Sequence, residues 1–557
     1  IDARQGTVIV SAAAGSGKTA VLIERIIKTI TDTKNPCDVD KLLIVTFTRA
    51  ATAEIRSRLF TAVNKALKEL IDNKEKEDNF ESKFKHLKRQ QMLIPSANIF
   101  TIDAFCSNLV RENFEALQIP PDFSMIDEVE AEKLKSDVLT ELLEKYYSSK
   151  NKEFENLVEL FMSGKNDNAI EETISNIYNF SRAFANPQKI MQKSLEEFNE
   201  NFSYKTSKYI EVIRDTALFE LKYYIKKVEN QLDLCQIVDP TYSTHKNFLY
   251  VNDDLNCAKK IHDLIVDYQI DDANALSINK VFERWSTATK GFNIVENKST
   301  FDDLKDFRNE LKDVIKALPL VFCETEQEVI DDIKTIKPSL ELLIKIVFEL
   351  DDTFRNKKLE QHTLDFSDVE AYALQLLLGE DGEKTELAKD LSTRFEGILI
   401  DEYQDTNDLQ DTIFRCLSNE ENNLFLVGDV KQSIYGFRQA MPEVFTGLRK
   451  NIREHSPEYA ITLSSNYRSR KGVTNNANFI FENIMTANAG GVDYKDNEQL
   501  NPEADYGERE KNVTDFETYL IETPKGSELE SQAKFVAQYV RKAIDEGMLV
   551  GKKGEER

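Results

Sequence analysis

Residues 7–26 read TVIVSAAAGSGKTAVLIERI, in which an apolar run is followed by a glycine-containing turn and then by a helical pattern. The run Thr7–Ser11 predicts a buried β-strand, and the apolar residues after Thr19 recur at helical spacing. Gly15 and Gly17 permit a tight backbone turn between the two elements. Backbone N–H groups at a helix start hold phosphates, while a lysine reaches the phosphate oxygens and a Ser/Thr hydroxyl binds Mg²⁺. The stretch therefore predicts a strand, a phosphate-binding loop and a helix.

Within this loop, Lys18 is expected to supply the charge and Thr19 the metal-binding hydroxyl. The usual motif is GxxxxGK[ST], and Ala12 stands at the position of its first glycine. A single match of this kind also arises by coincidence, so the rest of the sequence has to support it. The expected nucleotide-binding residues of the loop are Ala12, Ala13, Ala14, Gly15, Ser16, Gly17, Lys18 and Thr19.

The pattern of strand, turn and helix recurs along the chain. Further apolar runs of this kind are Leu42–Phe47, Ile99–Ile102, Gly397–Ile400, Leu424–Val427 and Tyr459–Leu463. Buried strands that alternate with helices are typical of a parallel α/β sheet. Between the third and fourth runs, Pro121–Leu350 is rich in Leu, Ile, Lys and Glu at helical spacing. The sequence therefore predicts an α/β protein with a large, mostly helical insertion. Charged patches on the predicted helices, such as Lys83–Arg89 just before the insertion, are expected on solvated helix faces.

The bulk composition narrows the class of protein. A chain of 557 residues is too long for one core, and its 41% hydrophobic and 31% charged residues are typical of soluble globular domains. No apolar stretch is long enough for a membrane span. The six cysteines are widely spaced, which indicates neither a zinc site nor disulfides, so we expect a cytoplasmic protein. The net charge of −26 excludes a surface that coats nucleic acid, so any DNA should bind in a local groove.

A second chemical signal lies in FEGILIDEYQDTN (395–407), an apolar strand that ends in two adjacent carboxylates. Transfer of a phosphoryl group to water needs one carboxylate to hold Mg²⁺ and another to orient or deprotonate the water. Asp401 fits the first role and Glu402 the second. Such acidic pairs also begin ordinary helices, and the combination with Lys18 is what favours the catalytic interpretation.

Two later segments combine aromatic and basic residues. NLFLVGDVKQSIYGFRQA (423–440) contains Gln432, which can bond a γ-phosphate or its water, and the aromatic residues Tyr435 and Phe437, on which bases can stack. The alternative is that these aromatic residues belong to the core of an ordinary loop. In SSNYRSR (464–470), Tyr467 can stack on adenine and Arg468 can reach the terminal phosphates, although this motif is weak by itself.

Taken together, AAAGSGKT, LLIVTFTRAATAEIRSRL, IFTIDAFC, LIDEYQDTN, LVGDVKQSIYGFRQA and LSSNYRSR occur in the order seen in UvrD-like superfamily 1 helicases. The wording of AAAGSGKTAVLIERI, TIDAFC, LDFSDVEAYALQLL and DVKQSIYGFR resembles the AddA/RecB branch, and the AddA (RexA-type) family of helicase–nuclease subunits most closely. The resemblance covers about residues 1–115 and 355–475 well. It covers the helical insertion only by position and character.

This resemblance implies site residues. ATP hydrolysis would involve Lys18, Thr19, Asp401, Glu402, Gln432 and Arg468, with Thr19 and Asp401 on Mg²⁺ and Tyr467 on the adenine. Contacts to single-stranded DNA would come from Phe47, Thr48, Thr101, Phe105, Tyr435 and Phe437. From the residues alone, the aromatics of TFT and FTIDAF read more simply as core, and the helix carrying Asp365 and Asp368 reads as structural.

The resemblance also implies a P-loop, RecA-like fold divided into four parts. These are residues 1–120, the first part of a RecA-like ATPase domain; 121–350, the helical insertion; 351–456, the second part of that domain; and 457–557, an incomplete second RecA-like domain. No segment resembles the nuclease domain of the family. The chain is therefore expected to be the helicase fragment of a longer protein.

The implied function is an ATP- and Mg²⁺-dependent DNA translocase and helicase that processes double-strand breaks for recombinational repair. Its implied partners are single- and double-stranded DNA ends and an AddB/RexB-like subunit in a heterodimer. A stand-alone UvrD-type repair helicase is one alternative, against which the TIDAFC wording counts. A non-catalytic scaffold that binds DNA ends is another, but a vestigial site has no reason to keep Lys18, Asp401 and Glu402 together.

Overall fold

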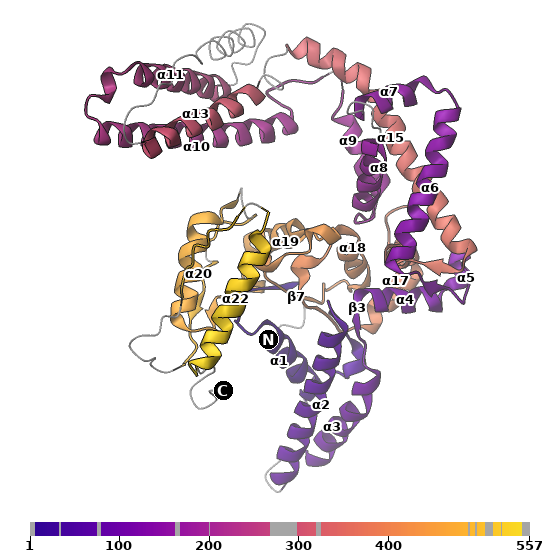
Figure 1. Cartoon of the computed structure of the whole chain (residues 1–557). Helices are drawn as coiled ribbons and strands as arrows, with labels where there is room; N and C mark the ends of the chain where they lie inside the picture. The colour runs from indigo at the N-terminus through magenta and orange to yellow at the C-terminus, as the bar shows by residue number, and fades with distance from the viewer. Residues whose placement is uncertain are drawn as a thin grey trace. The chain divides into compact units, whose positions relative to one another are not determined.

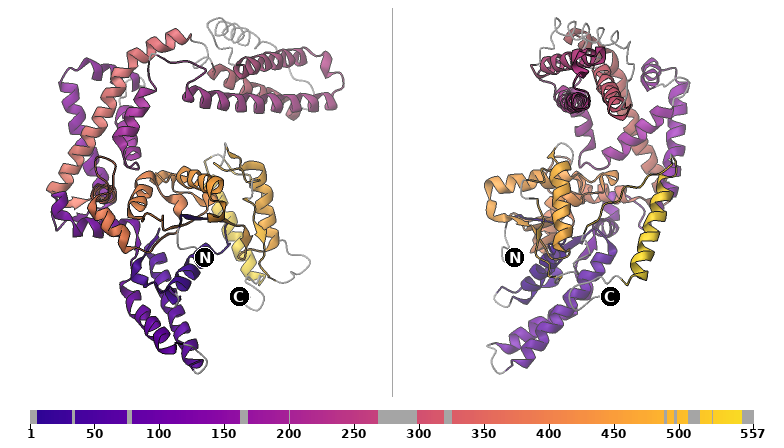
Figure 2. Two further views of the ribbon diagram at one scale, coloured as in Figure 1. Left: turned by 180° about the vertical axis from the view of Figure 1, so that it is seen from behind. Right: turned by 60° about the vertical axis from the view of Figure 1, so that its left-hand side comes forward.

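The structure is a computed structural model, shown in Figures 1 and 2. It describes residues 6–32, 35–74, 79–161, 168–199, 201–267, 298–318, 325–487, 491–495, 498–506, 516–524 and 526–547. Cys323, one of the six cysteines, lies outside these ranges, as do the last residues GKKGEER (551–557). The chain forms two compact units: residues 1–138, 176–187 and 351–557 make up the first, and residues 139–175 and 188–350 the second.

The first unit is built on one parallel sheet. Its six strands are β1 (Val8–Ala12), β2 (Leu42–Thr46), β3 (Ile99–Thr101), β6 (Gly397–Ile400), β7 (Leu424–Gly428) and β8 (Ala460–Leu463), in the order β3-β2-β6-β7-β1-β8. Every neighbouring pair is parallel, and Val10 pairs with Val427 on one side and with Ile461 on the other. The predicted parallel α/β sheet is therefore confirmed.

Alternate strand residues enter two separate cores, one on each face of the sheet. In β2, Leu42 and Ile44 face the core formed with α1 (Lys18–Thr31), α2 (Arg49–Asp72) and α3 (Phe80–Leu93). Leu43 and Val45 face the opposite core. Helices cover both faces, which explains why the strands read as continuous apolar runs. The helices on the second face are α4 (Ile102–Glu112), α5 (Phe114–Leu117), α16 (Phe366–Leu377), α17 (Glu386–Arg394), α18 (Asp408–Leu417) and α19 (Pro442–His455).

Smaller elements complete the first unit. The short strands β4 (Ser124–Met125) and β5 (Thr363–Leu364) pair in parallel, as do β9 (Ser465–Asn466) and β10 (Asn501–Pro502). Further helices of this unit, among the residues that the structure describes, are α20 (Lys471–Ile484) and α22 (Glu528–Asp545).

The second unit is helical throughout the residues that the structure describes, which confirms the predicted insertion. Its own helices are α7 (Lys152–Phe161), α9 (Pro187–Glu196), α10 (Lys208–Val238), α11 (Lys246–Val266) and α13 (Lys298–Ala317). Three further helices, α6 (Glu128–Ser148), α8 (Asn168–Ser181) and α15 (Glu326–Glu360), have several residues in both units, and α9 has its first residue, Pro187, in the first unit. In Figures 1 and 2, α10, α11 and α13 lie side by side, and they enclose a core that includes Leu221, Ile261 and Leu311. None of the helices that the structure describes is both long and apolar enough to span a bilayer.

The structure differs from the predicted four-part division in two places. Residues 457–463 were assigned to a second domain, yet β8 pairs with β1 through Ile9 to Ala12 and extends the first sheet. Residues 176–187 were assigned to the insertion, yet they belong to the first unit, where Arg182 forms ion pairs with Asp351 and Asp368. Both differences depend on contacts between segments far apart in sequence, which local periodicity does not encode.

Candidate nucleotide and DNA site

The predicted phosphate-binding loop connects β1 to α1 at the carboxyl edge of the sheet, where ligands of α/β proteins usually bind. Gly15 and Gly17 have φ angles of 72° and 88°, in the left-handed region that favours glycine. A Cβ on Gly15 would lie 2.7 Å from Nδ2 of Asn466 and 2.8 Å from Cβ of Arg468. Ala12, in contrast, is a fully buried strand residue without a positive φ, so this position does not need the glycine of the usual motif.

The segment around β9 holds the loop from the other side. Nδ2 of Asn466 donates to the carbonyl of Ala14 over 2.7 Å, and the N–H of Tyr467 donates to the carbonyl of Gly15 over 2.9 Å. The N–H of Ala13 also donates to the carbonyl of Leu463 over 2.8 Å. Tyr467 and Arg468 follow Asn466 directly and are exposed, so both predicted residues belong to the segment that contacts the loop.

The loop has the chemistry that a nucleoside triphosphate requires. Oγ of Ser16 is buried and has no hydrogen-bond partner among the described residues, so a donor is left for a ligand. The side chain of Lys18 is 11% exposed, and α1 begins at Lys18 with its free N–H groups at the loop. Thr19 follows, and its side chain is hydrogen-bonded to Asp401.

The two predicted carboxylates follow β6. Nζ of Lys18 lies 3.0 Å from Oε2 of Glu402, so the ion pair joins two motifs that are 384 positions apart in sequence. Glu402 has a φ of 53°, in the left-handed region that non-glycine residues adopt infrequently. Burial and the charge of Glu402 raise the pKa of Asp401 to about 6, although Lys18 and Thr19 act in the opposite direction. Asp401 and Thr19 together form a donor set suited to a hard divalent cation.

A hydrogen-bonded chain connects these carboxylates to the strand end after β7. Nε2 of Gln404 donates to Oε2 of Glu402 over 2.9 Å, and its Oε1 accepts from the N–H of Asp429 over 2.8 Å. Oδ2 of Asp429 accepts from Nε2 of Gln432 over 2.6 Å. Gln432 is thus linked to the carboxylates through Asp429 and Gln404.

Two of these participants were not predicted. Gln404 and Asp429 lie inside quoted motifs, DEYQDT and VGDVKQ, so their position next to the predicted residues was the available signal. Asp405 was also missed. Burial and the charge of Glu402 raise the pKa of Asp405 to about 6, and its Oδ1 is buried without a partner among the described residues.

The predicted DNA contacts include a row of aromatic rings. The ring centroids of Phe47 and Tyr435 are 4.6 Å apart, and those of Tyr435 and Phe437 are 5.8 Å apart. Phe47 is 37% exposed and Phe437 is 74% exposed, while Cζ of Arg438 lies 5.8 Å from the centroids of both Tyr435 and Phe437. Exposed rings with an adjacent guanidinium form a platform on which bases can stack.

The structure does not bring Phe105 to this row. Phe105 is 8% exposed and packs in the core with Cys106 and Leu109 of the same helix, so it offers no face to a base. Thr48 and Thr101 are the N-cap residues of α2 and α4, and their side chains accept from the N–H groups of Ala51 and Ala104. The burial of Phe105 favours the core interpretation, because the apolar face of α4 covers the sheet, and the DNA contact that the resemblance implies for Phe105 stays a prediction.

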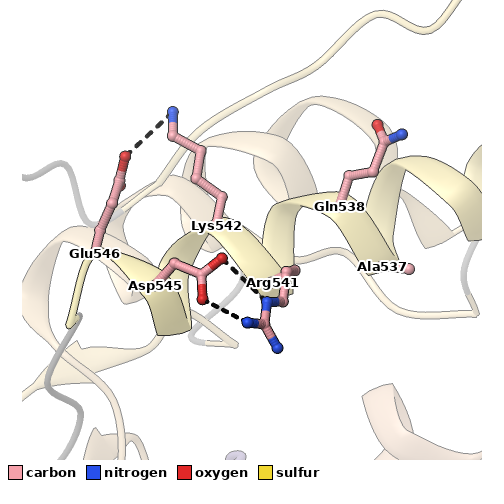
Figure 3. A pocket seen from close by; sticks show the side chains of 6 residues that line it. All are labelled: Ala537, Gln538, Arg541, Lys542, Asp545 and Glu546. Carbon is pink, nitrogen blue, oxygen red and sulfur yellow. Dashed lines mark hydrogen bonds and ion pairs between the residues drawn. The ribbon is translucent and has the colours of Figure 1, made fainter.

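Hollows elsewhere on the described surface do not compete with this site. One hollow of about 560 Å³ lies along α22 and is open to solvent. Figure 3 shows that ion pairs within one helix face, Arg541 with Asp545 and Lys542 with Glu546, line it. None of the predicted site residues belongs to it.

Comparison with known proteins gives a consistent result. Residues 1–269 and 256–453 match the UvrD/REP helicase N-terminal domain. The chain is 35% identical over 565 residues to an ATP-dependent helicase/nuclease subunit of Clostridium botulinum (strain Alaska E43 / Type E3), covering 97% of this chain and 43% of the relative. It is 36% identical over 581 residues to the protein of the same name from Clostridium novyi (strain NT), covering 98% of this chain and 45% of the relative.

A third relative of that name, from Ruminiclostridium cellulolyticum (strain ATCC 35319 / DSM 5812 / JCM 6584 / H10), is 34% identical over 548 residues, covering 93% of this chain and 42% of the relative. The chain thus spans less than half the length of these relatives. The domain match, the parallel sheet and the phosphate loop agree on a P-loop, RecA-like fold. The chain belongs to the UvrD/REP helicase family.

Proposed function

We propose that this chain is the ATP-driven motor of a DNA helicase that works as part of a helicase–nuclease. The observation that carries the proposal is the ion pair between Lys18 and Glu402, which unites the phosphate loop with the carboxylates beside an exposed aromatic row. The relatives named as ATP-dependent helicase/nuclease subunits support the same assignment.

ATP would bind with its phosphates on the loop that precedes α1. Lys18 and Oγ of Ser16 would donate to the phosphate oxygens, Arg468 would approach them from the β9 side, and Tyr467 would stack on the adenine. Thr19 and Asp401 would hold Mg²⁺, which supplies charge neutralisation on the phosphates.

Hydrolysis would depend on a competition between the ATP phosphates and Glu402 for the amine of Lys18. Phosphate oxygens attract Lys18 away from Glu402, and Glu402 is then left to orient and deprotonate the attacking water. Gln404 keeps Oε2 of Glu402 in place through its 2.9 Å hydrogen bond. Gln432 would respond to the γ-phosphate and pass the change to Tyr435, three residues later on the same loop.

DNA would bind as a single strand. Phe47, Tyr435 and Phe437 present rings for stacking, and each stacked base contributes about 1–3 kcal/mol. Thr48 and Thr101 lie at helix starts whose N–H groups suit phosphates of the strand. Repeated closing and reopening with each ATP would move the strand along this row.

In the cell, the motor would act in the cytoplasm on DNA ends at double-strand breaks, as one member of a heterodimer with an AddB/RexB-like partner. The word "subunit" in the names of the relatives supports a partner. The four-part division of the chain stays a proposal as well, with the two boundary changes described above.

A tailed duplex tests this function in the complete natural polypeptide with its partner subunit. The expected result is strand separation that requires ATP and Mg²⁺ and that disappears with Lys18→Ala. Lys68→Ala, an exposed lysine on α2, is the matched control and should behave as the wild type. Binding to DNA ends with no ATP turnover would instead favour the scaffold function.

A further inference from the structure

A cluster of four buried ionic side chains lies behind the proposed DNA loop. Nζ of Lys431 is 2.8 Å from Oδ1 of Asp429 and 2.5 Å from Oε2 of Glu498. Nη1 of Arg449, from α19, is 2.6 Å from Oε1 of Glu498. These four side chains are at most 10% exposed. Glu498 therefore bridges two cations that come from two different elements.

Glu498 belongs to the segment that supports the nucleotide side of the site. Three residues later, β10 pairs with β9. The N–H of Asn501 donates to the carbonyl of Ser464 over 2.8 Å, and the N–H of Glu503 donates to the carbonyl of Asn466 over 2.9 Å. Because Asn466 also fixes the phosphate loop, a displacement of the segment that carries Glu498 would be felt at Tyr467 and Arg468.

The cluster continues the chain of contacts that begins at the phosphate loop. The chain of polar contacts runs through Lys18, Glu402, Gln404, Asp429, Lys431 and Glu498, and each step measures between 2.5 and 3.0 Å. At Asp429 the chain branches to Gln432, and Tyr435 follows three residues later. Glu498 is thus the far anchor of a path that passes both the catalytic carboxylates and the start of the aromatic loop.

Stability alone is a poor reason for such a cluster. Desolvating four charged groups is costly, and buried ion pairs of this kind are often no more stabilising than apolar residues of similar volume. Burial by itself would raise the pKa of Glu498, but the charges of Lys431 and Arg449 hold that pKa below its usual value. What a buried pair of this kind supplies is a fixed geometry, since any shift of one partner leaves a charge uncompensated.

We propose that Glu498 is a positioning residue that couples ATP turnover to single-stranded DNA by fixing Lys431 and, through it, Asp429 and the aromatic loop. The inference rests on the proposed function. Without the charge of Glu498, Asp429 is the one charged partner left to Lys431 among the described residues. Asp429 is then less firmly fixed. Its carboxylate no longer holds Gln432 in one position, and its N–H no longer keeps a constant hydrogen bond to Gln404. The aromatic loop therefore binds DNA less often in the geometry that allows ATP turnover.

The test is Glu498→Gln in the complete natural polypeptide with its partner subunit, with ATPase rates measured against the concentration of an oligo-dT strand. The DNA concentration that gives half-maximal ATPase should rise about tenfold, within the range usual for coupling between two sites. The rate at saturating DNA and the affinity for a fluorescent ATP analogue should change less than about twofold, because the variant keeps the catalytic groups and the β9–β10 backbone hydrogen bonds that hold the segment of Tyr467 and Arg468. Glu503→Gln removes an exposed charge five residues away and should match the wild type.

Further variants separate positioning from folding. Lys431→Met combined with Glu498→Gln should cost no more than the larger single effect, because both act through one contact. Should Glu498→Gln melt well below the wild type, Arg449→Lys, which keeps the charge but shortens the side chain, should raise the half-maximal DNA concentration at an unchanged melting temperature.

The outcomes also separate the two proposals. A wild-type protein whose ATPase ignores DNA would overturn the proposed function, and this inference with it. DNA-stimulated wild type together with an unchanged DNA dependence in the Glu498 variant would overturn this inference alone. The same holds if affinity, maximal rate and melting temperature all fall together, since that pattern reports a structural role.

Discussion

Lys18 is held by a partner that it would have to leave for ATP to react. Its amine pairs with Glu402 at 3.0 Å, and Glu402 also accepts from Gln404. A triphosphate on the loop would offer Lys18 several negative oxygens in place of one carboxylate. The ion pair can therefore keep the carboxylate of Glu402 bound to Lys18, and so unable to activate water, until the phosphates are in place.

Glu402→Gln should therefore lower ATP hydrolysis by about 100-fold or more, the usual contribution of a general base. Binding of ATP should remain, because Gln leaves Lys18 free for the phosphates. Single-turnover hydrolysis and titration with a fluorescent ATP analogue measure the two effects separately. Glu396→Gln, an exposed position just before β6, serves as control. Near-normal hydrolysis by the Glu402 variant would show that another group activates the water.

Glu370 gives a prediction for stability. It is buried, accepts from Nε2 of Gln410 over 2.7 Å, and burial together with the charge of Asp103 raises its pKa to about 8. In the unfolded chain a glutamate ionises near pH 4.3, so the unfolded state releases this proton first. The stabilisation that Glu370 contributes is then fully present below about pH 4 and is lost as the pH rises through 8.

Glu370→Gln cannot ionise and keeps an oxygen for Gln410. Relative to this variant, the wild type should lose about 1.4 kcal/mol of stability for each pH unit between roughly 5 and 8. Melting temperatures of both proteins at several pH values in this range provide the measurement, with Glu360→Gln as an exposed control. Parallel curves for wild type and Glu370→Gln would mean that Glu370 is already ionised at neutral pH.

At the scale of elements, two phenylalanines that follow strand ends behave differently. Phe437 lies in the short 3₁₀ helix Gly436–Arg438 after β7 and is 74% exposed, whereas Phe105 lies on α4 and is 8% exposed. Phe437→Ala should weaken binding of a single strand by about 1–3 kcal/mol and leave the melting temperature unchanged. Phe105→Ala should destabilise folding by about 3–5 kcal/mol through a core cavity.

Fluorescence anisotropy with oligo-dT and thermal melting measure these two effects side by side. Weaker binding of oligo-dT by Phe105→Ala, without loss of stability, would show that Phe105 contacts DNA. Loss of stability in Phe437→Ala would instead place its ring in the core.

Phe437 and Phe105 also show what could and could not be predicted from the sequence. Strand ends and the glycine loop follow from local patterns, so the sheet and the joint role of Lys18 and Glu402 could be anticipated. The DNA role of Phe47 came from the family resemblance alone, since the local pattern favoured a core position. Whether an aromatic residue at such a strand end is core or surface depends on the face that its helix presents, which the motif does not contain. The roles of Gln404 and Asp429 likewise required the strand order that sets β6 beside β7.

At the scale of the whole molecule, local periodicity predicted the helical insertion but not its limits. Residues 176–187 return to the first unit because Arg182 pairs with Asp351 and Asp368, residues 169 and 186 positions away in sequence. β8 joins the first sheet because β1 has a free edge beside it. Contacts across such distances are set by the fold and leave no mark on the local pattern.

The net charge of −26 leads to a prediction about salt. Binding that depends on stacking and a few local cations releases few counterions, so the logarithm of the affinity for single-stranded DNA should fall with the logarithm of salt concentration at a slope no steeper than about −3. Anisotropy titrations with oligo-dT between about 50 and 200 mM salt measure this slope. A slope beyond about −5 would reveal an extended basic track.

The most direct test of the motor is steady-state ATP hydrolysis by the complete natural polypeptide, with and without single-stranded DNA. The account predicts that DNA stimulates hydrolysis, that Lys18→Ala and Glu402→Gln each abolish it, and that Lys68→Ala and Glu396→Gln do not. Hydrolysis that persists in the Lys18 and Glu402 variants, or a wild type that binds DNA but never turns over ATP, would contradict it.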